Sequence, residues 1–202
     1  MSNTITELRL QLLANGYSPI PNLDKRTFTK DWPSVEITTE QIAHWGRSRR
    51  FSATGLRLDN GLAVIDVDVN GGEQLAEAIA EAMVAVVPKL KDALVRFGKG
   101  YKEAWFVRAS EPFSRIHSPA WTAPGQSVDD GTHRVEVFGG GSARQFGAFG
   151  AHTVDEDGNV VVSYEWQEHS PADTPLASLP ELTKDEFFAA IDAATAAIQK
   201  SG

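Results

Sequence analysis

The chain has 202 residues, of which 42% are hydrophobic and 23% are charged. These proportions are ordinary for a folded, water-soluble protein, and the length suffices for one large domain or two small lobes. The net charge of −8 argues against a surface that binds nucleic acid all over, although it leaves room for a local basic groove. Because there are no cysteines, disulfides, thiolate zinc sites and cysteine nucleophiles are excluded.

The N-terminal segment, residues 1–16, has neither a basic start nor a continuous apolar run, so it is not typical of a signal peptide. No stretch of the sequence approaches the ~20 apolar residues of a membrane span. We therefore expect a soluble, cytoplasmic protein that makes no contact with a membrane.

The first predicted helix begins with a capping box at Thr4 and ends at Gly16. The next segment, residues 17–34, is interrupted by prolines and is predicted to be extended and loop-like. A short helix is then predicted from its cap at Thr38 to Trp45.

Two apolar runs, residues 52–58 and 62–69, flank the turn sequence Asp-Asn-Gly, which predicts a β-hairpin. A helix is predicted over residues 72–87, where the following proline stops it. Residues 92–98 and 102–109 indicate two more strands, separated by a basic, glycine-containing turn.

The segment 111–132 is predicted to be irregular. A second hairpin is predicted from residues 133–138 and 143–152, with a run of glycines as its turn, and another strand over residues 159–166. A last helix is capped by a box that starts at Thr183. Because strands predominate in the middle and helices flank them, the pattern favours an α+β fold.

The run "AVIDVDV" places two carboxylates, Asp66 and Asp68, within an otherwise apolar strand. An ionised aspartate in a protein core is costly unless something compensates its charge. Alternate residues of a strand share a face, so Asp66 and Asp68 are predicted to project together while Ile65 and Val67 pack into the core. Two anions held side by side favour a bound cation.

A third carboxylate, Glu136, lies in the predicted strand "HRVEVF" and shares a face with Arg134. Two acids on one strand and an acid on a neighbouring strand are a workable ligand set for Mg²⁺ or Mn²⁺, which prefer oxygen ligands. A pair of such ions ~4 Å apart would polarise an attacking hydroxyl and neutralise a leaving pyrophosphate. Spacing alone leaves a structural alternative, in which the acids pair with arginines or lie at an exposed strand end.

The order of the segments "GYSPIPNLDKRTFTKDWPS", "TGLRLDNGLAVIDVDVNGG", "LVRFGKGYKEAWFVRA" and "RVEVFGGGSARQFGAFGAH" resembles a known family. It is similar to the primase-polymerase domain of the archaeo-eukaryotic primase superfamily, in the form found at the N-terminus of phage and plasmid replication proteins. The resemblance implies an α+β fold in which a catalytic antiparallel sheet, like that of an RNA-recognition motif, packs with an N-terminal α/β lobe and flanking helices. We expect residues 1–202 to form one such catalytic domain of two interleaved lobes, as the N-terminal part of a longer protein.

The resemblance also implies an activity: a DNA-directed nucleotidyltransferase, in which Asp66, Asp68 and Glu136 hold two Mg²⁺ or Mn²⁺ ions. The expected partners are a single-stranded DNA template with its primer, nucleoside triphosphates, and a helicase domain or helicase protein. For a phage or plasmid protein, the location would be the cytoplasm of the bacterial host. Two alternatives stay open, namely a non-catalytic nucleic-acid-binding module and a metal-dependent glycosyltransferase with an Asp-x-Asp motif.

The family's Ser-x-His motif, which contacts the triphosphate, is not visible at its expected place, where "RFGKGYKEAWF" stands instead. We predict that Lys102, with Lys99 and Arg96, supplies the positive charge there, since an ammonium group binds phosphate well. A histidine, His117, lies downstream in the segment predicted to be irregular, and is the weaker candidate.

Further contacts are predicted with less specific signals. Gln145 or His152, in the strand after the glycine turn, would contact the base, sugar or phosphates of a nucleotide; the alternative is that each has a structural role. The densest basic run holds Arg47, Arg49 and Arg50, which would bind template phosphates. Its alternative is a solvated helix end, where arginines suit the helix dipole.

Overall fold

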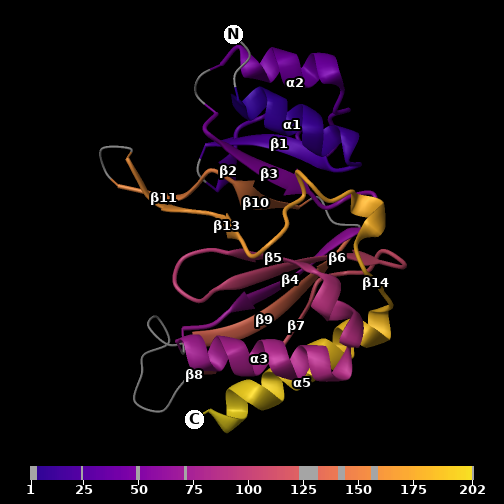
Figure 1. Ribbon diagram of the computed structural model, residues 1–202, viewed down its shortest axis with the longest axis vertical. Coiled ribbons are helices and arrows are strands. Elements are labelled where there is room, and N and C mark those ends of the chain that lie inside the picture. Colours follow the sequence, from indigo (N-terminus) through magenta and orange to yellow (C-terminus); the bar gives the residue numbers. More distant parts are fainter. Residues whose placement is uncertain are drawn as a thin grey trace.

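The computed structural model describes residues 4–23, 25–48, 51–70, 72–122, 132–140, 144–155 and 159–201. It is a mixed α+β protein of two lobes, each built on its own sheet, with α1 and α2 at one end of the long axis and α3 and α5 at the other (Figure 1). Among the described residues, no helix has the length and apolar character needed to cross a membrane.

The upper lobe contains a four-stranded antiparallel sheet of order β10-β3-β1-β2, flanked by two helices. Strand β10 comes from far along the chain, so the two lobes are interleaved in sequence. The elements of this lobe are α1 (Thr4–Ala14), β1 (Ser18–Leu23), β2 (Arg26–Thr27), α2 (Thr39–Gly46), β3 (Ala53–Arg57) and β10 (Gln145–Phe149).

The lower lobe contains a larger sheet of order β13-β5-β6-β4-β9-β7, in which β14 also pairs with β6 and β8 with β9. Helices α3 and α5 cover one of its faces (Figure 1). Its elements are β4 (Leu62–Asp68), α3 (Glu73–Val86), β5 (Leu94–Phe97), β6 (Glu103–Ala109), β7 (Ile116–His117), β8 (Trp121–Thr122), β9 (Thr132–Gly139), β13 (Glu165–Trp166), β14 (Glu181–Leu182) and α5 (Lys184–Lys200).

The alternation predicted for β4 is confirmed. Ile65 and Val67 are fully buried in a core that also contains side chains of α3 and α5, whereas Val64 belongs to a second core beneath the upper lobe. Asp66 is half-buried and Asp68 is exposed. One face of β4 is therefore dry along its length, and the other changes from apolar to acidic.

The predicted caps at Thr38 and Thr183 are confirmed, whereas Thr4 is the first residue of α1 rather than its cap. The Thr38 hydroxyl accepts a hydrogen bond from the Gln41 N–H at the start of α2, and a reciprocal capping box between Thr183 and Glu186 starts α5. These side chains satisfy N–H groups that have no partner inside a helix. Val86, at the end of α3, is 51% exposed, in contrast to the buried Leu75, Ile79 and Met83 of the same helix.

Both predicted hairpins are wrong, although the Asp-Asn-Gly turn lies where the sequence places it. The Asp59-Asn60-Gly61 turn has positive φ at Asn60 and Gly61, but β3 pairs with β1 and β10 while β4 pairs with β6 and β9. Likewise, β9 pairs with β4 and β10 with β3. In both cases the two flanking strands belong to different lobes, because each strand pairs with strands far away in the sequence.

The proline-containing segment predicted to be loop-like forms β1, which lies inside the upper sheet. Pro19 and Pro21 pair in register with Leu56 and Thr54 of β3. Residues two apart direct their backbone nitrogens to the same side, and β2 pairs only with Asn22 and Leu23 on the far side of β1. The two prolines are tolerated because that far side is largely an open edge.

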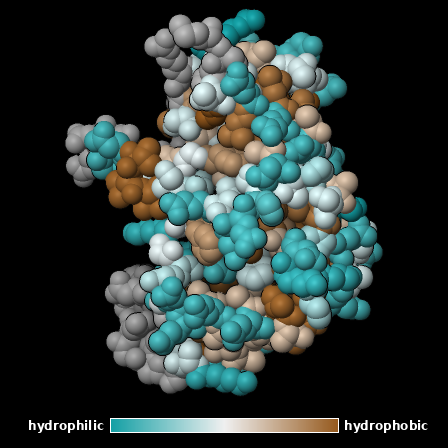
Figure 2. Space-filling view, viewed as in Figure 1, coloured by the Kyte–Doolittle hydropathy of each residue, from teal (hydrophilic) through white to brown (hydrophobic). Residues whose placement is uncertain are grey.

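Two strands after the glycine turn leave the body of the protein as a separate two-stranded ribbon, β11 (Ala151–Val154) with β12 (Val160–Ser163). The ribbon projects to the left in Figure 1, and Figure 2 shows apolar side chains on it. Val160 and Val161 are 57% and 61% exposed. The single strand predicted over residues 159–166 is thus divided between this ribbon and β13 of the lower sheet.

Candidate active site

A row of polar side chains crosses the face of the lower sheet that lies opposite α3 and α5. The register aligns Arg96 (β5) with Ala104 (β6), Asp66 (β4), Glu136 (β9) and His117 (β7). Residues that are directly opposite one another on paired strands point to the same face. The ladder therefore brings one buried arginine, two acids and a histidine into a single line.

A cleft of about 320 Å³ opens over the β4–β6 part of this row, between the two lobes. Almost all of the residues predicted to handle metal and nucleotide line it together, although they come from five separate segments. The lining residues are Lys25, Asp66, Asp68, Arg96, Gly98, Lys99, Lys102, Gln145, Phe146, Gly147, His152 and Tyr164. The structure thus assembles one site from the predicted set, with Glu136 beside it rather than in its lining.

Asp66 is the deepest acid of the cleft. Its pKa is raised from 3.8 to about 6. Burial is the largest cause and the charges of Asp68 and Glu136 act in the same direction, while Arg96 and Lys102 act in the opposite direction. The carboxyl is therefore destabilised as an anion in its present surroundings. A cation bound at Asp66 would relieve this cost.

Asp68 lies near the mouth of the cleft, 53% exposed in its side chain, and forms an ion pair of 2.5 Å with Lys102. An exposed pair of this kind contributes little to stability, because water screens both charges. The ion pair between Lys102 and Asp68 can therefore be broken at small cost. Lys102 could then bind a phosphate, and Asp68 could bind a metal ion.

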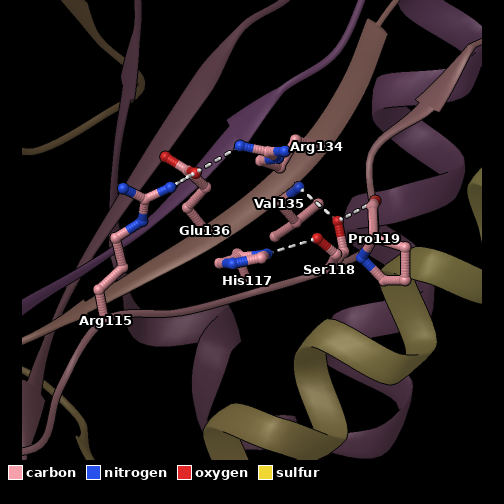
Figure 3. A network of polar contacts seen from close by, with 7 residues as sticks. All are labelled: Arg115, His117, Ser118, Pro119, Arg134, Val135 and Glu136. Carbon is pink, nitrogen blue, oxygen red and sulfur yellow. Dashed lines mark hydrogen bonds and ion pairs between the residues drawn. The ribbon is translucent and has the colours of Figure 1, made fainter.

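Glu136 is paired with two arginines. Its Oε1 accepts a hydrogen bond from Arg115 Nη2 and lies 3.5 Å from Arg134 Nη1, so two guanidinium groups flank it (Figure 3). The prediction that Glu136 and Arg134 share a face is confirmed. Contrary to the sequence-based expectation, His117 is not in an irregular segment: it lies in β7, where backbone pairing sets it opposite Glu136.

Arg96 supplies a buried positive charge at the back of the cleft. Its side chain stacks on the Tyr164 ring at 4.3 Å and its Nη1 donates a hydrogen bond to the Gly147 carbonyl. Its Nε, in contrast, is buried and has no hydrogen-bond partner. Desolvation lowers the pKa of Arg96, which Tyr164 and Asp66 partly offset. A buried guanidinium with unused donor capacity suits an anionic ligand.

Sequence reasoning missed Lys25, which enters the cleft from the β1–β2 turn. Desolvation and the neighbouring Arg96 and Lys102 lower the pKa of its ammonium group. The Lys25 carbonyl accepts a hydrogen bond from Gln145 Nε2, and Gln145 Oε1 accepts one from Asn22 Nδ2. Gln145 therefore uses both ends of its amide to position the turn, which supports the structural alternative for this residue.

Close approach at this point depends on a glycine. A Cβ at Gly55 would lie 1.8 Å from Gln145 Oε1 and 2.7 Å from Asn22 Nδ2, so any side chain there would displace the amide that holds Lys25. The sequence signal for Lys25 was the Lys-Arg pair that follows β1. Whether this pair reaches the cleft depends on a strand pairing that the sequence does not reveal.

His152 lies on β11 at the edge of the cleft, with its ring against Tyr164 and its Nδ1 2.7 Å from Thr153 Oγ1. Burial and the surrounding cations, Lys25 first among them, lower its pKa to about 4. The imidazole is therefore neutral at pH 7. An anion in the cleft would neutralise those cations and raise this pKa.

The carboxylate oxygens of these acids are the donor type that a hard divalent cation prefers, but the acids are not arranged around a common point. Within the described ranges, no three acidic or histidine side chains converge on one point. Asp66 and Asp68 are available on one strand, and Glu136 can join them only when its carboxylate turns away from Arg115. The raised pKa of Asp66 is the observation that favours a cation here.

Of the three predicted DNA-binding arginines, only Arg47 is described, and it is not among the residues that line this cleft. Arg47 is exposed and follows α2 as its C-cap, which agrees with the helix-end alternative. Arg49 and Arg50 lie outside the described residues, so that prediction stays open.

Taken together, these features define a two-lobed α+β protein with carboxylates and cations facing one another in an interlobe cleft. The chain belongs to the Prim-Pol family, the N-terminal domain of bifunctional DNA primase/polymerases, whose family model matches residues 9–182. A comparison with curated proteins gives no match. The family match confirms the resemblance drawn from the sequence motifs.

Proposed function

We propose that this domain is a template-dependent DNA primase/polymerase that joins an incoming nucleoside triphosphate to a 3′-hydroxyl. The observation that carries the proposal is the single cleft in which Asp66 and Asp68 face the cations Arg96, Lys25 and Lys102. In the reaction, the 3′-hydroxyl loses its proton and its oxygen forms a bond with the α-phosphorus. The bond between the α-phosphorus and the oxygen that bridges it to the β-phosphate breaks, and pyrophosphate leaves.

The metal ligands would be Asp66 and Asp68, joined by Glu136 after it exchanges its arginine partner. Two Mg²⁺ or Mn²⁺ ions there would polarise the 3′-hydroxyl and neutralise charge on the leaving pyrophosphate. Strand β4 holds both aspartates on a rigid, buried backbone, so the ligands need little reorganisation. Arg96, Lys99 and Lys102 would orient the triphosphate, which places catalysis on positioning and charge rather than on covalent chemistry.

A second candidate is a non-catalytic nucleic-acid-binding module. It is favoured by the ion pairs that already neutralise two of the three acids, Asp68 with Lys102 and Glu136 with Arg115. This candidate leaves Asp66 unexplained, because nothing in that arrangement requires an acid whose pKa is raised by burial. The glycosyltransferase alternative gains no support from the family match.

The test is primer extension on a single-stranded DNA template with Mg²⁺ or Mn²⁺. We expect Asp66→Ala/Asp68→Ala to reduce extension by at least about 10³-fold, because metal ions supply several kcal/mol of charge stabilisation in such reactions. The matched control is Glu81→Ala/Asp192→Ala, which removes two exposed acids from α3 and α5. Equal extension by the aspartate variant and the control would contradict the proposal. Metal-independent DNA binding without any extension would favour the non-catalytic module.

A further inference from the structure

A second, open depression of about 490 Å³ adjoins the cleft on the upper lobe. It lies along β2 and the start of β10, which Figure 1 places on the same side of the molecule as the β11–β12 ribbon. Two of its lining residues, Lys25 and Gln145, also line the cleft. The two hollows therefore form one continuous surface, joined at the turn that Gln145 holds in place.

The depression combines positive charge with aromatic rings. Its described lining contains three cations and no acid, although the whole chain has a net charge of −8. Phe28 is 53% exposed, and Trp32 is half-buried against the core of the upper lobe. The lining residues are Lys25, Arg26, Thr27, Phe28, Trp32, Arg144 and Gln145.

One cation of this set is held in place. The guanidinium of Arg144 lies 5.2 Å from the centre of the Phe138 ring, beneath the upper lobe. Stacking of this kind fixes the plane of a guanidinium and leaves its edge free to donate hydrogen bonds. Lys25, in the β1–β2 turn, and Arg26, in β2, are exposed. The three cations that line the depression therefore come from two separate parts of the chain, the β1–β2 segment and the residue before β10.

A ligand with this complementarity must offer both a regular series of negative charges and flat apolar faces. Single-stranded DNA does so, because its bases are unstacked and its phosphates follow the same path. Duplex DNA presents its phosphates but keeps its base faces buried in the stack. The exposed aromatic ring favours the single strand over the duplex.

We propose that this depression binds the single-stranded DNA template, with a base on Phe28 and phosphates on Arg26 and Arg144. The inference rests on the proposed polymerase function, which it extends by giving the template a path. Because the depression meets the cleft at Lys25 and Gln145, a template held there enters next to the incoming nucleotide. The arginines predicted from the sequence, Arg47, Arg49 and Arg50, are not required by this path.

The test is fluorescence anisotropy of a labelled single-stranded DNA of about 12 nucleotides, within the usual site sizes, with the full chain and without metal or nucleotide. Stacking on one aromatic residue corresponds to an affinity change of about 5- to 140-fold. We therefore expect Phe28→Leu to weaken binding by an amount in this range, and Phe28→Tyr, which keeps the ring, to stay within about twofold of the unmodified protein.

The arginines are tested by salt dependence. Each phosphate neutralised on a single strand contributes about 0.7 to the slope of log affinity against log salt. Arg26→Ala/Arg144→Ala should therefore lower the slope by about 1.4, and the control Lys91→Ala/Lys200→Ala, which removes two exposed cations elsewhere, should leave it unchanged. Unchanged affinity in Phe28→Leu, an equal loss in Phe28→Tyr, or equal slopes in the two double variants would each overturn the proposal.

Failure of this inference can be distinguished from failure of the polymerase proposal. Binding of nucleoside triphosphate with Mg²⁺, measured by calorimetry, should persist in Phe28→Leu and be lost in Asp66→Ala/Asp68→Ala, whereas single-stranded DNA binding should show the opposite pattern. If DNA binding depends on Phe28 but the unmodified protein neither binds the triphosphate nor extends a primer, the template path stands and the polymerase proposal fails. Extension that is insensitive to Phe28→Leu on a long template would overturn the path alone.

Discussion

The two faces of β4 are built from alternate residues of one short run, yet they have opposite environments. Ile65 and Val67 pack against α3 and α5 with no exposed surface, while Asp66 and Asp68 look into a cleft lined with cations. The dry face fixes the backbone, and the fixed backbone holds the two carboxylates close together despite their repulsion. Burial of the apolar face stabilises the fold, whereas the two carboxylates held close together destabilise it. The two contributions can be tested separately.

The largest effect is expected from a substitution on the buried, apolar face of β4. Ile65→Ala removes a fully buried side chain, and should reduce the free energy of unfolding by about 2–5 kcal/mol because it leaves a cavity. Urea denaturation measures this change. Nucleotide affinity, measured well below the unfolding midpoint, should stay unchanged, and a loss of stability below about 1 kcal/mol would show that α3 and α5 do not pack as described.

On the cleft face, Arg96→Met keeps the length of the side chain but removes its charge. We expect nucleoside triphosphate affinity to fall by about 10- to 150-fold, the range for lost hydrogen bonds to a charged group. Isothermal titration calorimetry measures this loss. The matched control is Arg108→Met on the neighbouring strand β6, whose guanidinium pairs with Glu181 outside the cleft. A similar loss in both variants would mean that the effect is not local.

Removing the charge of Asp66 should stabilise the metal-free protein. Because its pKa is raised to about 6 in the fold, the folded chain binds the proton more tightly than the unfolded chain between about pH 4 and 6. Stability therefore falls as the pH rises through that window, and Asp66→Asn should be about 1–3 kcal/mol more stable at pH 8. Thermal unfolding at pH 8 and pH 4 checks this, since the gain should vanish at pH 4. A gain of equal size at both pH values would contradict the assigned cause.

The smallest effect is expected at the end of the acid row. Arg115→Met removes one of the two arginines that flank Glu136 and breaks a partly exposed ion pair, which is worth about 0.2–1 kcal/mol. Mn²⁺ affinity, measured by electron paramagnetic resonance without DNA, should therefore rise about 1.5- to fivefold. Lys89→Met, which breaks an ion pair with Glu186 far from the cleft, is the control. Unchanged Mn²⁺ affinity in Arg115→Met would mean that Glu136 does not take part in metal binding.

The sequence predicted the local features of this site well, because they depend on alternation and capping within single elements. The placement of Asp66 and Asp68 on one face, and of Glu136 opposite the apolar face of its own strand, follows from a period of two. The start of α5 follows from its capping box. These features need no knowledge of what lies across the sheet.

Strand partnership could not be predicted in the same way. The Asp-Asn-Gly turn indicates a reversal of the chain, but whether its flanking strands pair depends on β10, which meets β3 through Gln145 and Arg57, 88 positions apart in the sequence. The same non-local pairing brings Lys25 to Asp66. Glu136 shows a further limit, because its arginine partner depends on side-chain orientation rather than on the position of the backbone.

The row from Arg96 to His117 also has a consequence for how the chain folds. Since the period of a strand is two, a slip of β9 by one position would turn Glu136 toward α3 and α5 and expose Val135 and Val137 in its place. An ionised glutamate buried among aliphatic side chains would make such a misfolded chain far less stable. Glu136, a proposed metal ligand, thus also favours the correct register of β9. A chain that has folded in this register therefore has its site residues in line.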